Sequence, residues 1–378
     1  MKDILDRFSR ITADPYKFVS DWKESNKKKV IGCFPMDIPE EIVHAADMLP
    51  VVIWRGNEPV TWGHAHLTTY NCGLVRSFID DAVKGKLGFM DGMILWRQCL
   101  QVHELPYIIE TNVHPAYFSY LYLPATFPGE VSRNFAVEEF ERMKRGLEEF
   151  GGNTITVEAL NRSIEIYNRN RSLLRKLYDL RRKNPGVLKA KEVLAIVQSS
   201  MLMPKEDHNK LLEDLLMNIE KKEASTDGKK KVVLTGSLCQ TPQAAILDLI
   251  EDLGMVVVDD DMYIGTRYFD NDVEVTANPM QSFADRYFKP TPPSATKGDW
   301  TVHWGDSVTD TVRRNHADGV ISLLIKFCPP HLCYYPDVKM RLREAEIPEV
   351  LIEVEHEMVS LENTRTRLQS FIESIGGL

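Results

Sequence analysis

The sequence contains no run of about 18 or more apolar residues, and it does not start with a charged segment that leads into an apolar one. The first absence predicts that no helix spans a membrane. The second predicts that the chain carries no secretory signal peptide. We therefore expect a cytoplasmic protein that has no membrane as a partner.

Positive charge is in deficit. Asp and Glu outnumber Lys and Arg by 55 to 46, which gives a formal net charge of −9. Proteins that bind nucleic acid as their main function line a groove with Lys and Arg to neutralise phosphates. The composition therefore argues against a nucleic-acid partner.

Cysteine is present, but not in the spacings that are typical of a metal site. The six cysteines include no CxxC pair, which makes a zinc ribbon or a ferredoxin-type cluster run unexpected. A disulfide framework is not expected in a cytoplasmic chain of this size. If these thiols bind a metal, they must do so from separate segments that the fold brings together. The cysteines are Cys33, Cys72, Cys99, Cys239, Cys328 and Cys333.

Strand and helix patterns alternate in two blocks of the chain, which predicts an α/β fold with two parallel-sheet domains. Between them, dense charge at helical spacing predicts a helical segment, with Thr156 as a helix start and Asn184-Pro185 as a stop. We expect an N-terminal α/β domain over 1–150, a helical segment and linker over 151–228, and a C-terminal α/β domain over 229–378. The runs read as strand-like are KKVIGCFP, LPVVIW, FMDGMILW, YIIETNV, YFSYLYLP, KVVLTG, MVVVDDD, GVISLLIK and VLIEVE.

Several cysteines come directly after such strands. Cys99, Cys239 and Cys328 each follow the C-terminal end of an apolar run. Open parallel sheets bind their ligands in the crevice outside these ends. The stretch FCPPHLCYYP adds two prolines behind Cys328, which predicts a stiff turn that holds a thiol in place. The alternative is that the cysteines are unrelated packed thiols, as we expect for Cys33.

Six motifs, in order and spread over nearly the whole chain, resemble the 2-hydroxyacyl-CoA dehydratase and ATP-dependent (class I) benzoyl-CoA reductase superfamily. Within it the chain is most similar to the smaller, cluster-bearing subunit of benzoyl-CoA reductase, the gamma-type subunit. The resemblance implies two Rossmann-like or flavodoxin-like domains. The motifs are IGCFPMDIPEEIVHAADMLPV, YNCGLVRSFID, FMDGMILWRQC, PKEDHNKLLEDLL, TGSLCQTP with VVVDDDMYIGTRYF, and KFCPPHLCYYP.

The resemblance also implies metal ligands. Matched by motif, Cys72, Cys99 and Cys328 would hold an iron–sulfur cluster, [4Fe-4S] by default, and three thiolates would leave one iron open to another ligand. Pro329 stands where the family usually has aspartate, which leaves the hydrogen bonding around the Cys328 sulfur open. Cys239 and Cys333 are candidates for places near the cluster, with a structural role as the alternative.

Polar residues near these cysteines are weaker candidates. His64 and His66 precede Cys72, and His103 follows Cys99, so each is a candidate proton donor or a residue that contacts a ligand. An exposed loop histidine is the alternative. Arg267 follows three aspartates, Asp259 to Asp261, and either pairs with them or orients a contact between subunits.

The function implied by the resemblance is reduction of the aromatic ring of benzoyl-CoA, or a close analogue, to a cyclic dienoyl-CoA by single-electron steps. The implied partners are a paralogous cluster-bearing subunit, an ATP-hydrolysing iron–sulfur activator, a ferredoxin as electron donor, and the acyl-CoA substrate. No GxxxxGK[ST] phosphate loop is present, which agrees with ATP chemistry on another chain. Two alternatives stay open: a 2-hydroxyacyl-CoA dehydratase subunit that eliminates water, and a non-catalytic subunit that relays electrons to a paralogue or stabilises it.

Overall fold

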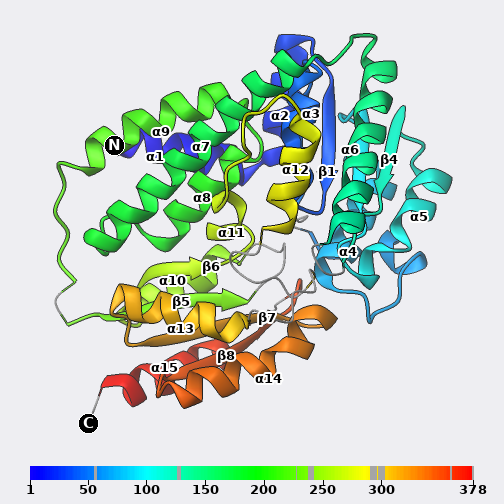
Figure 1. The fold of residues 1–378 in the computed structure, drawn as a ribbon. Helices are drawn as coiled ribbons and strands as arrows, with labels where there is room; N and C mark the ends of the chain where they lie inside the picture. The colour runs from blue at the N-terminus through cyan, green and yellow to red at the C-terminus, as the bar shows by residue number, and fades with distance from the viewer. Residues whose placement is uncertain are drawn as a thin grey trace.

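The computed structural model describes most of the chain. The described residues are 1–54, 58–125, 129–226, 228–236, 242–289, 296, 303–357 and 360–376. They form two four-stranded sheets, both parallel throughout, with helices around them. The predicted α/β class with two parallel sheets is confirmed (Figure 1).

The first sheet has the strand order β2-β1-β3-β4. Its strands are short and apolar, and three of the four are buried along their whole length, so they read as continuous hydrophobic runs. The strands are β1 (Val30–Phe34), β2 (Leu49–Val52), β3 (Gly92–Trp96) and β4 (Tyr117–Leu121). The helices along this part of the chain are α3 (Glu40–Ala45), η1 (Trp62–Ala65), α4 (Gly73–Val83), η2 (Leu100–Val102), α5 (Leu105–Asn112) and α6 (Glu130–Gly151).

The second sheet repeats this topology, with the order β6-β5-β7-β8. Its strands are β5 (Lys230–Gly236), β6 (Met255–Asp261), β7 (Gly319–Ile325) and β8 (Glu349–Val354). The helices along it are α10 (Ala244–Asp252), α11 (Thr266–Phe269), α12 (Pro279–Phe288), α13 (Trp304–Asn315), α14 (Pro329–Glu344) and α15 (Glu362–Gly376).

The predicted helical segment is also observed. Thr156 caps the longest of its helices by accepting a hydrogen bond from the Ala159 N–H at 3.1 Å, and Asn184 directly follows the last residue of that helix, as expected of a stop. The first N-terminal helix, α1, lies on the same side of the molecule (Figure 1), where it packs against α8 and α9, whereas Lys23 of α2 pairs with Asp91 just before the first sheet's β3. These helices are α1 (Lys2–Ala13), α2 (Pro15–Asn26), α7 (Val157–Lys183), α8 (Ala190–Ser200) and α9 (Lys205–Ile219).

Packing does not follow the order of the chain everywhere. Helix α12, which comes after β6 in sequence, packs against α6 and α7. Its buried residues Met280 and Phe283 belong to the same hydrophobic core as the first sheet. The division into 1–150, 151–228 and 229–378 stays a prediction.

Two local predictions are wrong. YIIETNV, read as strand-like, lies mostly in helix α5, which begins with a proline in its first turn and buries Ile108 and Ile109 on one side. The two prolines after Cys328 do not make a separate turn; Pro329 is the first residue of α14. A proline tolerates the first helical turn because its missing N–H would have no partner within the helix there.

In both sheets the chain reverses its direction of travel next to the first strand. It passes from β1 outward to β2 and then crosses to β3, and it passes from β5 outward to β6 and then crosses to β7. Ligands of open α/β sheets bind at such a reversal, outside the carboxyl ends of the strands. Cys99 follows β3 and Cys328 follows β7, so each sheet delivers one cysteine at its own reversal point.

Candidate metal centre

Cys72, Cys99 and Cys328 line one cavity, although they come from three distant segments. The free space among the lining residues is about 370 Å³, open solvent included, and only about 20 Å³ of it is wide enough for a water molecule. Apart from the thiols the walls are mostly apolar. The other lining residues are Pro35, Leu74, Val75, Gln98, Gln101, Val102, Ile325, Pro329 and Pro330.

Each of the three cysteines is the residue that precedes a helix. Cys72 precedes α4, Cys99 precedes η2, and Cys328 precedes α14. The first N–H groups of a helix have no partner within the helix and point toward the capping residue. Phe327 has a positive φ of 59°, which is unfavourable for a bulky residue and turns the chain between β7 and α14. The backbone is therefore strained at the residue that places Cys328.

Contacts between segments hold the thiols at this position. The Cys72 N–H donates to Gln101 Oε1 at 3.2 Å, which ties the Cys72 segment to the Cys99 segment. The rings of Tyr70 and Phe327 meet edge to face with centroids 5.8 Å apart, which joins the chain before Cys72 to the chain before Cys328. The cavity is therefore braced across the two sheets.

Gly73 is part of this bracing, and we predict that Gly73→Ala is destabilising. A Cβ at Gly73 would lie 2.5 Å from the Cβ of His356, which follows β8, so α4 would have to move away from the second sheet. We expect the free energy of unfolding in urea to fall by about 1–3 kcal/mol. As a control, Gly376→Ala adds a Cβ with no atom within 4 Å and should change it by less than about 0.5 kcal/mol. Equal stability of the two variants would contradict the prediction.

The pKa of each of the three thiols is raised above its ordinary value, chiefly by burial. Burial raises the pKa of Cys72 to about 12. Burial also raises the pKa of Cys328 well above its ordinary value, and the neighbouring Cys72 and Cys99 add to this rise. Since iron binds the thiolate, loading the site with metal would displace the protons of these thiols.

The donor set fits an iron–sulfur cluster. Two buried thiols and one half-buried thiol in a mostly apolar cavity, each at the start of a helix, match what a cluster requires of its ligands. Among the described residues, no three or more His, Cys, Asp or Glu side chains are arranged around a single metal ion. A cluster does not need that arrangement, because its thiolates bind separate irons.

The structure adds one residue that the sequence analysis missed. His331 is buried, and its Nδ1 lies 3.4 Å from the Cys328 sulfur. Burial and the neighbouring Arg267 lower the pKa of its imidazole to about 3. The signal in the sequence was its place three residues after Cys328, in the first turn of a helix that we did not expect to begin at Pro329.

The other candidates lie elsewhere. His64 and His103 are exposed, His66 is half-buried, and none of the three is among the residues that line the cysteine cavity. Cys333 is exposed on α14. Their proposed roles stay predictions.

Three further residues complete the comparison with the sequence analysis. Cys239 lies outside the described residues. Cys33 is buried within β1, as expected of a core thiol. Arg267 pairs with Asp261, Nε to Oδ1 at 2.8 Å, which is one of the two roles considered for it.

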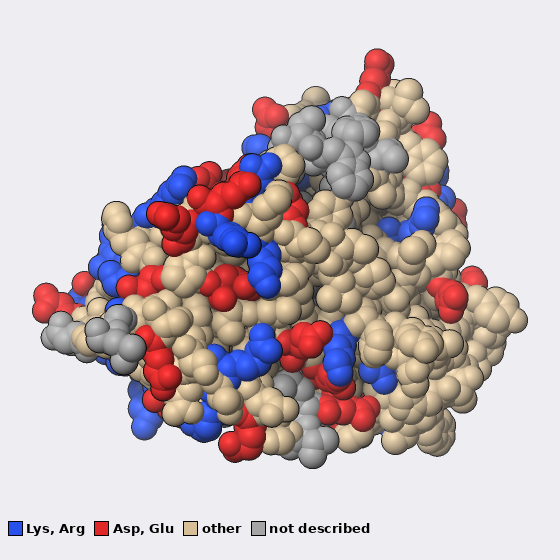
Figure 2. Space-filling view, turned by 90° about the horizontal axis from the view of Figure 1, so that it is seen from below, with Lys and Arg blue, Asp and Glu red and all other residues tan. Residues whose placement is uncertain are grey.

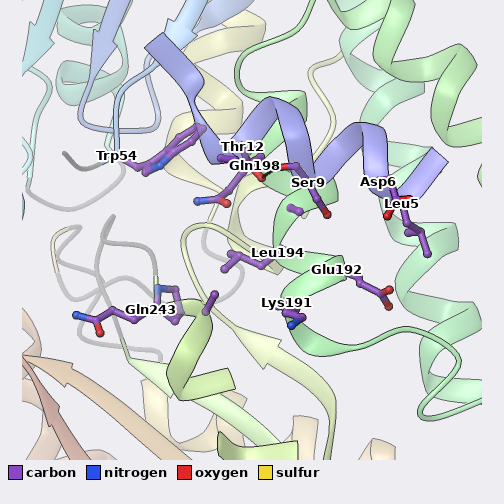
Figure 3. A pocket seen from close by; sticks show the side chains of 14 residues that line it. Leu5, Asp6, Ser9, Thr12, Trp54, Lys191, Glu192, Leu194, Gln198 and Gln243 are labelled. Carbon is purple, nitrogen blue, oxygen red and sulfur yellow. Dashed lines mark hydrogen bonds between the residues drawn. The ribbon is translucent and has the colours of Figure 1, made fainter. Parts of the chain in front are cut away.

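A larger cavity of about 540 Å³ lies between α1, α8 and the start of α10 (Figure 3). Within the described part of the chain its walls hold no cysteine or histidine. Asp6 and Glu192 line it together with Lys191, which is itself paired with Asp248 at 2.9 Å. This wall therefore has no excess of positive charge with which to attract the phosphates of a ligand. Because its described residues also lack cysteine and histidine, we do not place a metal centre here.

The motif order seen in the sequence has counterparts in known proteins. Residues 35–375 match the model of the family described as 2-hydroxyglutaryl-CoA dehydratase, D-component. The chain belongs to this family. No helix in the described residues is long and apolar enough to cross a membrane.

Curated relatives match the chain over almost their full length. A benzoyl-CoA reductase subunit of Thauera aromatica is 30% identical, with 99% of this chain and 98% of the relative covered. The (R)-phenyllactyl-CoA dehydratase beta subunit of Clostridium sporogenes is 27% identical, with 97% of each covered. The beta subunit of (R)-2-hydroxyglutaryl-CoA dehydratase of Acidaminococcus fermentans is 26% identical, with 98% and 99% covered. The relatives are thus subunits of reductases and of dehydratases.

Proposed function

We propose that this chain is the iron–sulfur subunit of an ATP-dependent benzoyl-CoA reductase, which converts benzoyl-CoA or a close analogue to a cyclic dienoyl-CoA. The observation that carries the proposal is the meeting of Cys72, Cys99 and Cys328 in one cavity where both sheets reverse. The 30% identity to a benzoyl-CoA reductase subunit, against 26–28% for three dehydratase beta subunits, supports the choice of reaction.

The residues of this chain would hold a cluster and shield it. When bound by the three thiolates, an iron–sulfur cluster supplies one-electron chemistry at low potential. Leu74, Val75 and Ile325 in the cavity wall keep water away from it, and exclusion of water protects reactive species from side reactions. Backbone N–H groups at the helix starts would stabilise the negative charge on the sulfurs.

The surface around the cysteines supports the proposal of a partner subunit. Exposed large apolar side chains lie within two residues of the cysteines in sequence: Tyr70 is 72% exposed and Leu100 73% exposed, and Phe327 is 38% exposed. Helices α4 and α5 lie at the right in Figure 1, and the right-hand part of the surface in Figure 2 carries few charged side chains. Exposed apolar groups gathered on one face are typical of protein–protein interfaces. The proposed partners are a paralogous cluster-bearing subunit and the ATP-hydrolysing activator that a ferredoxin would reduce.

A second candidate function is electron relay to a catalytic paralogue. The lining of the cysteine cavity favours it, because none of the described lining residues is a charged side chain that could bind the phosphates of an acyl-CoA. In that case the acyl-CoA would bind mainly to the partner subunit.

The test is the reaction of the complex, purified anaerobically with its partner subunits. With ATP and a low-potential reductant we expect benzoyl-CoA to yield a cyclic dienoyl-CoA, and no product without ATP. Formation of an enoyl-CoA from a 2-hydroxyacyl-CoA, with benzoyl-CoA left unchanged, would overturn the proposal and identify a dehydratase. Electron relay would be favoured if substitutions of cavity residues beside the cysteines in this chain left turnover intact.

A further inference from the structure

The hydrogen-bond donors around the three cysteines differ at one position. At Cys72, the backbone N–H groups of Leu74 and Val75, two and three residues further on, face the sulfur. At Cys99, the N–H groups two and three residues further on do the same. Two of the three sulfurs thus share one pattern, which follows from their place before a helix.

Cys328 cannot follow this pattern. The residue two positions after it is Pro330, which has no backbone N–H. Only the N–H of His331, three positions further on, is left to face the sulfur. The imidazole of the same residue also lies beside this sulfur, with Nδ1 3.4 Å from Sγ.

The imidazole is held in this orientation by its neighbours. The ring of Trp304 meets it edge to face with centroids 4.9 Å apart, and the ring of Tyr263 does so at 6.1 Å. The Trp304 indole N–H donates to Asp261, and Asp261 is paired with Arg267. His331 is therefore fixed by a buried network that begins at the end of β6 and that the proposed reaction does not otherwise use.

We propose that His331 is a positioning residue whose imidazole N–H donates to the Cys328 sulfur, replaces the donor that Pro330 lacks, and raises the reduction potential of the bound cluster. The inference rests on the proposed function, in which the three cysteines hold a cluster. A metal-bound thiolate carries no proton, so the hydrogen bond must run from nitrogen to sulfur. Such a bond favours the more negative, reduced cluster, which is why hydrogen bonds to sulfur raise cluster potentials.

The first experiment measures the reduction potential of the anaerobically purified protein by a redox titration followed by electron paramagnetic resonance. His331→Leu introduces an apolar side chain of similar size and removes the donor. His331→Asn instead retains an N–H group near the position of Nδ1. In His331→Leu we expect the ratio of reduced to oxidised cluster at a fixed potential to fall about tenfold, equivalent to about 59 mV for one electron. His331→Asn should stay close to the wild type.

A second variant tests whether His331 stands in for the backbone N–H that Pro330 lacks. Pro330→Ala restores the backbone N–H that Cys72 and Cys99 already have at this position. In the His331→Leu background it should recover part of the lost potential, and Leu332→Ala, at the exposed position two residues further on, should recover none. Unchanged potentials in His331→Leu, or no recovery with Pro330→Ala, would overturn the inference.

A measurement on the wild type does not depend on the folding of any variant. In protein supplied with histidine that carries ¹⁵N in the imidazole ring alone, the backbone nitrogen of His331 beside the sulfur stays unlabelled. Pulsed electron paramagnetic resonance of the reduced cluster should then show one weakly coupled ¹⁵N, as expected across a hydrogen bond from the imidazole to sulfur. No coupling would contradict the inference, and so would a strong coupling of the kind given by nitrogen bound directly to iron. Absence of iron and sulfide from the wild-type protein would instead count against the proposed function.

Discussion

Cys328→Ser is expected to remove most of the iron and sulfide from the anaerobically purified protein. The serine hydroxyl is a poor ligand for iron at neutral pH, and two thiols would remain to hold the cluster. Loss of groups that merely support a ligand costs about 10–100-fold in metal affinity, so loss of the ligand itself should cost at least about 100-fold. Iron and sulfide analysis, together with electron paramagnetic resonance, measures the effect.

Cys333→Ser is the matched control for this experiment. Cys333 is a second cysteine of the same motif, on the same helix, but exposed and outside the cavity. We expect it to keep the full iron content and the wild-type spectrum. Wild-type iron in Cys328→Ser would remove the basis of the metal centre, and equal loss in both variants would show that the effect is not specific to the cavity.

Arg267→Met is expected to lower the free energy of unfolding by about 3–5 kcal/mol. Arg267 and Asp261 are each only 5% exposed, and Nε lies 2.8 Å from Oδ1. The substitution keeps most of the volume but leaves the Asp261 carboxylate buried beside Trp304 without its ion-pair partner. Burying a carboxylate without compensation is far more costly than losing an ion pair in water. Urea unfolding at pH 7 measures the difference.

The control is Arg314, an exposed arginine that pairs with Asp259, another aspartate of β6. Arg314 lies 3.4 Å from Asp259 and its side chain is 60% exposed, while Asp259 keeps hydrogen bonds and ion pairs with Asn315 and Arg182. Arg314→Met should therefore cost no more than about 1 kcal/mol. A comparable loss in both variants would show that burial of the pair does not determine its contribution.

Local patterns predicted most of the secondary structure because they depend on neighbours in the chain. The apolar runs that became β1, β3, β5 and β7 were recognisable without the fold, since buried parallel strands read as continuous hydrophobic segments. The cap at Thr156 was recognisable because a capping hydroxyl acts within three residues. YIIETNV failed for the same reason: a short apolar run fits a strand as well as one face of a helix, and packing decides between them.

The candidate site too was predictable where it depends on neighbours in the chain and unpredictable where it depends on packing. That cysteines follow the ends of strands could be read from the chain, and the motif order gave Cys72, Cys99 and Cys328 as a set. That they meet depends on the two sheets facing each other across contacts such as Tyr70 with Phe327, between residues more than 250 positions apart. No pattern along the chain encodes such a contact.

By itself the sequence determined the α/β class and the family and gave three thiols as candidate ligands, because composition, periodicity and motif order are properties of the chain. Only the tertiary structure decided that the thiols share a cavity, that His331 contacts one of them, and that Arg267 is buried with Asp261. The physical reason is that burial and side-chain direction arise from packing between distant segments, and packing exists only once the chain has folded.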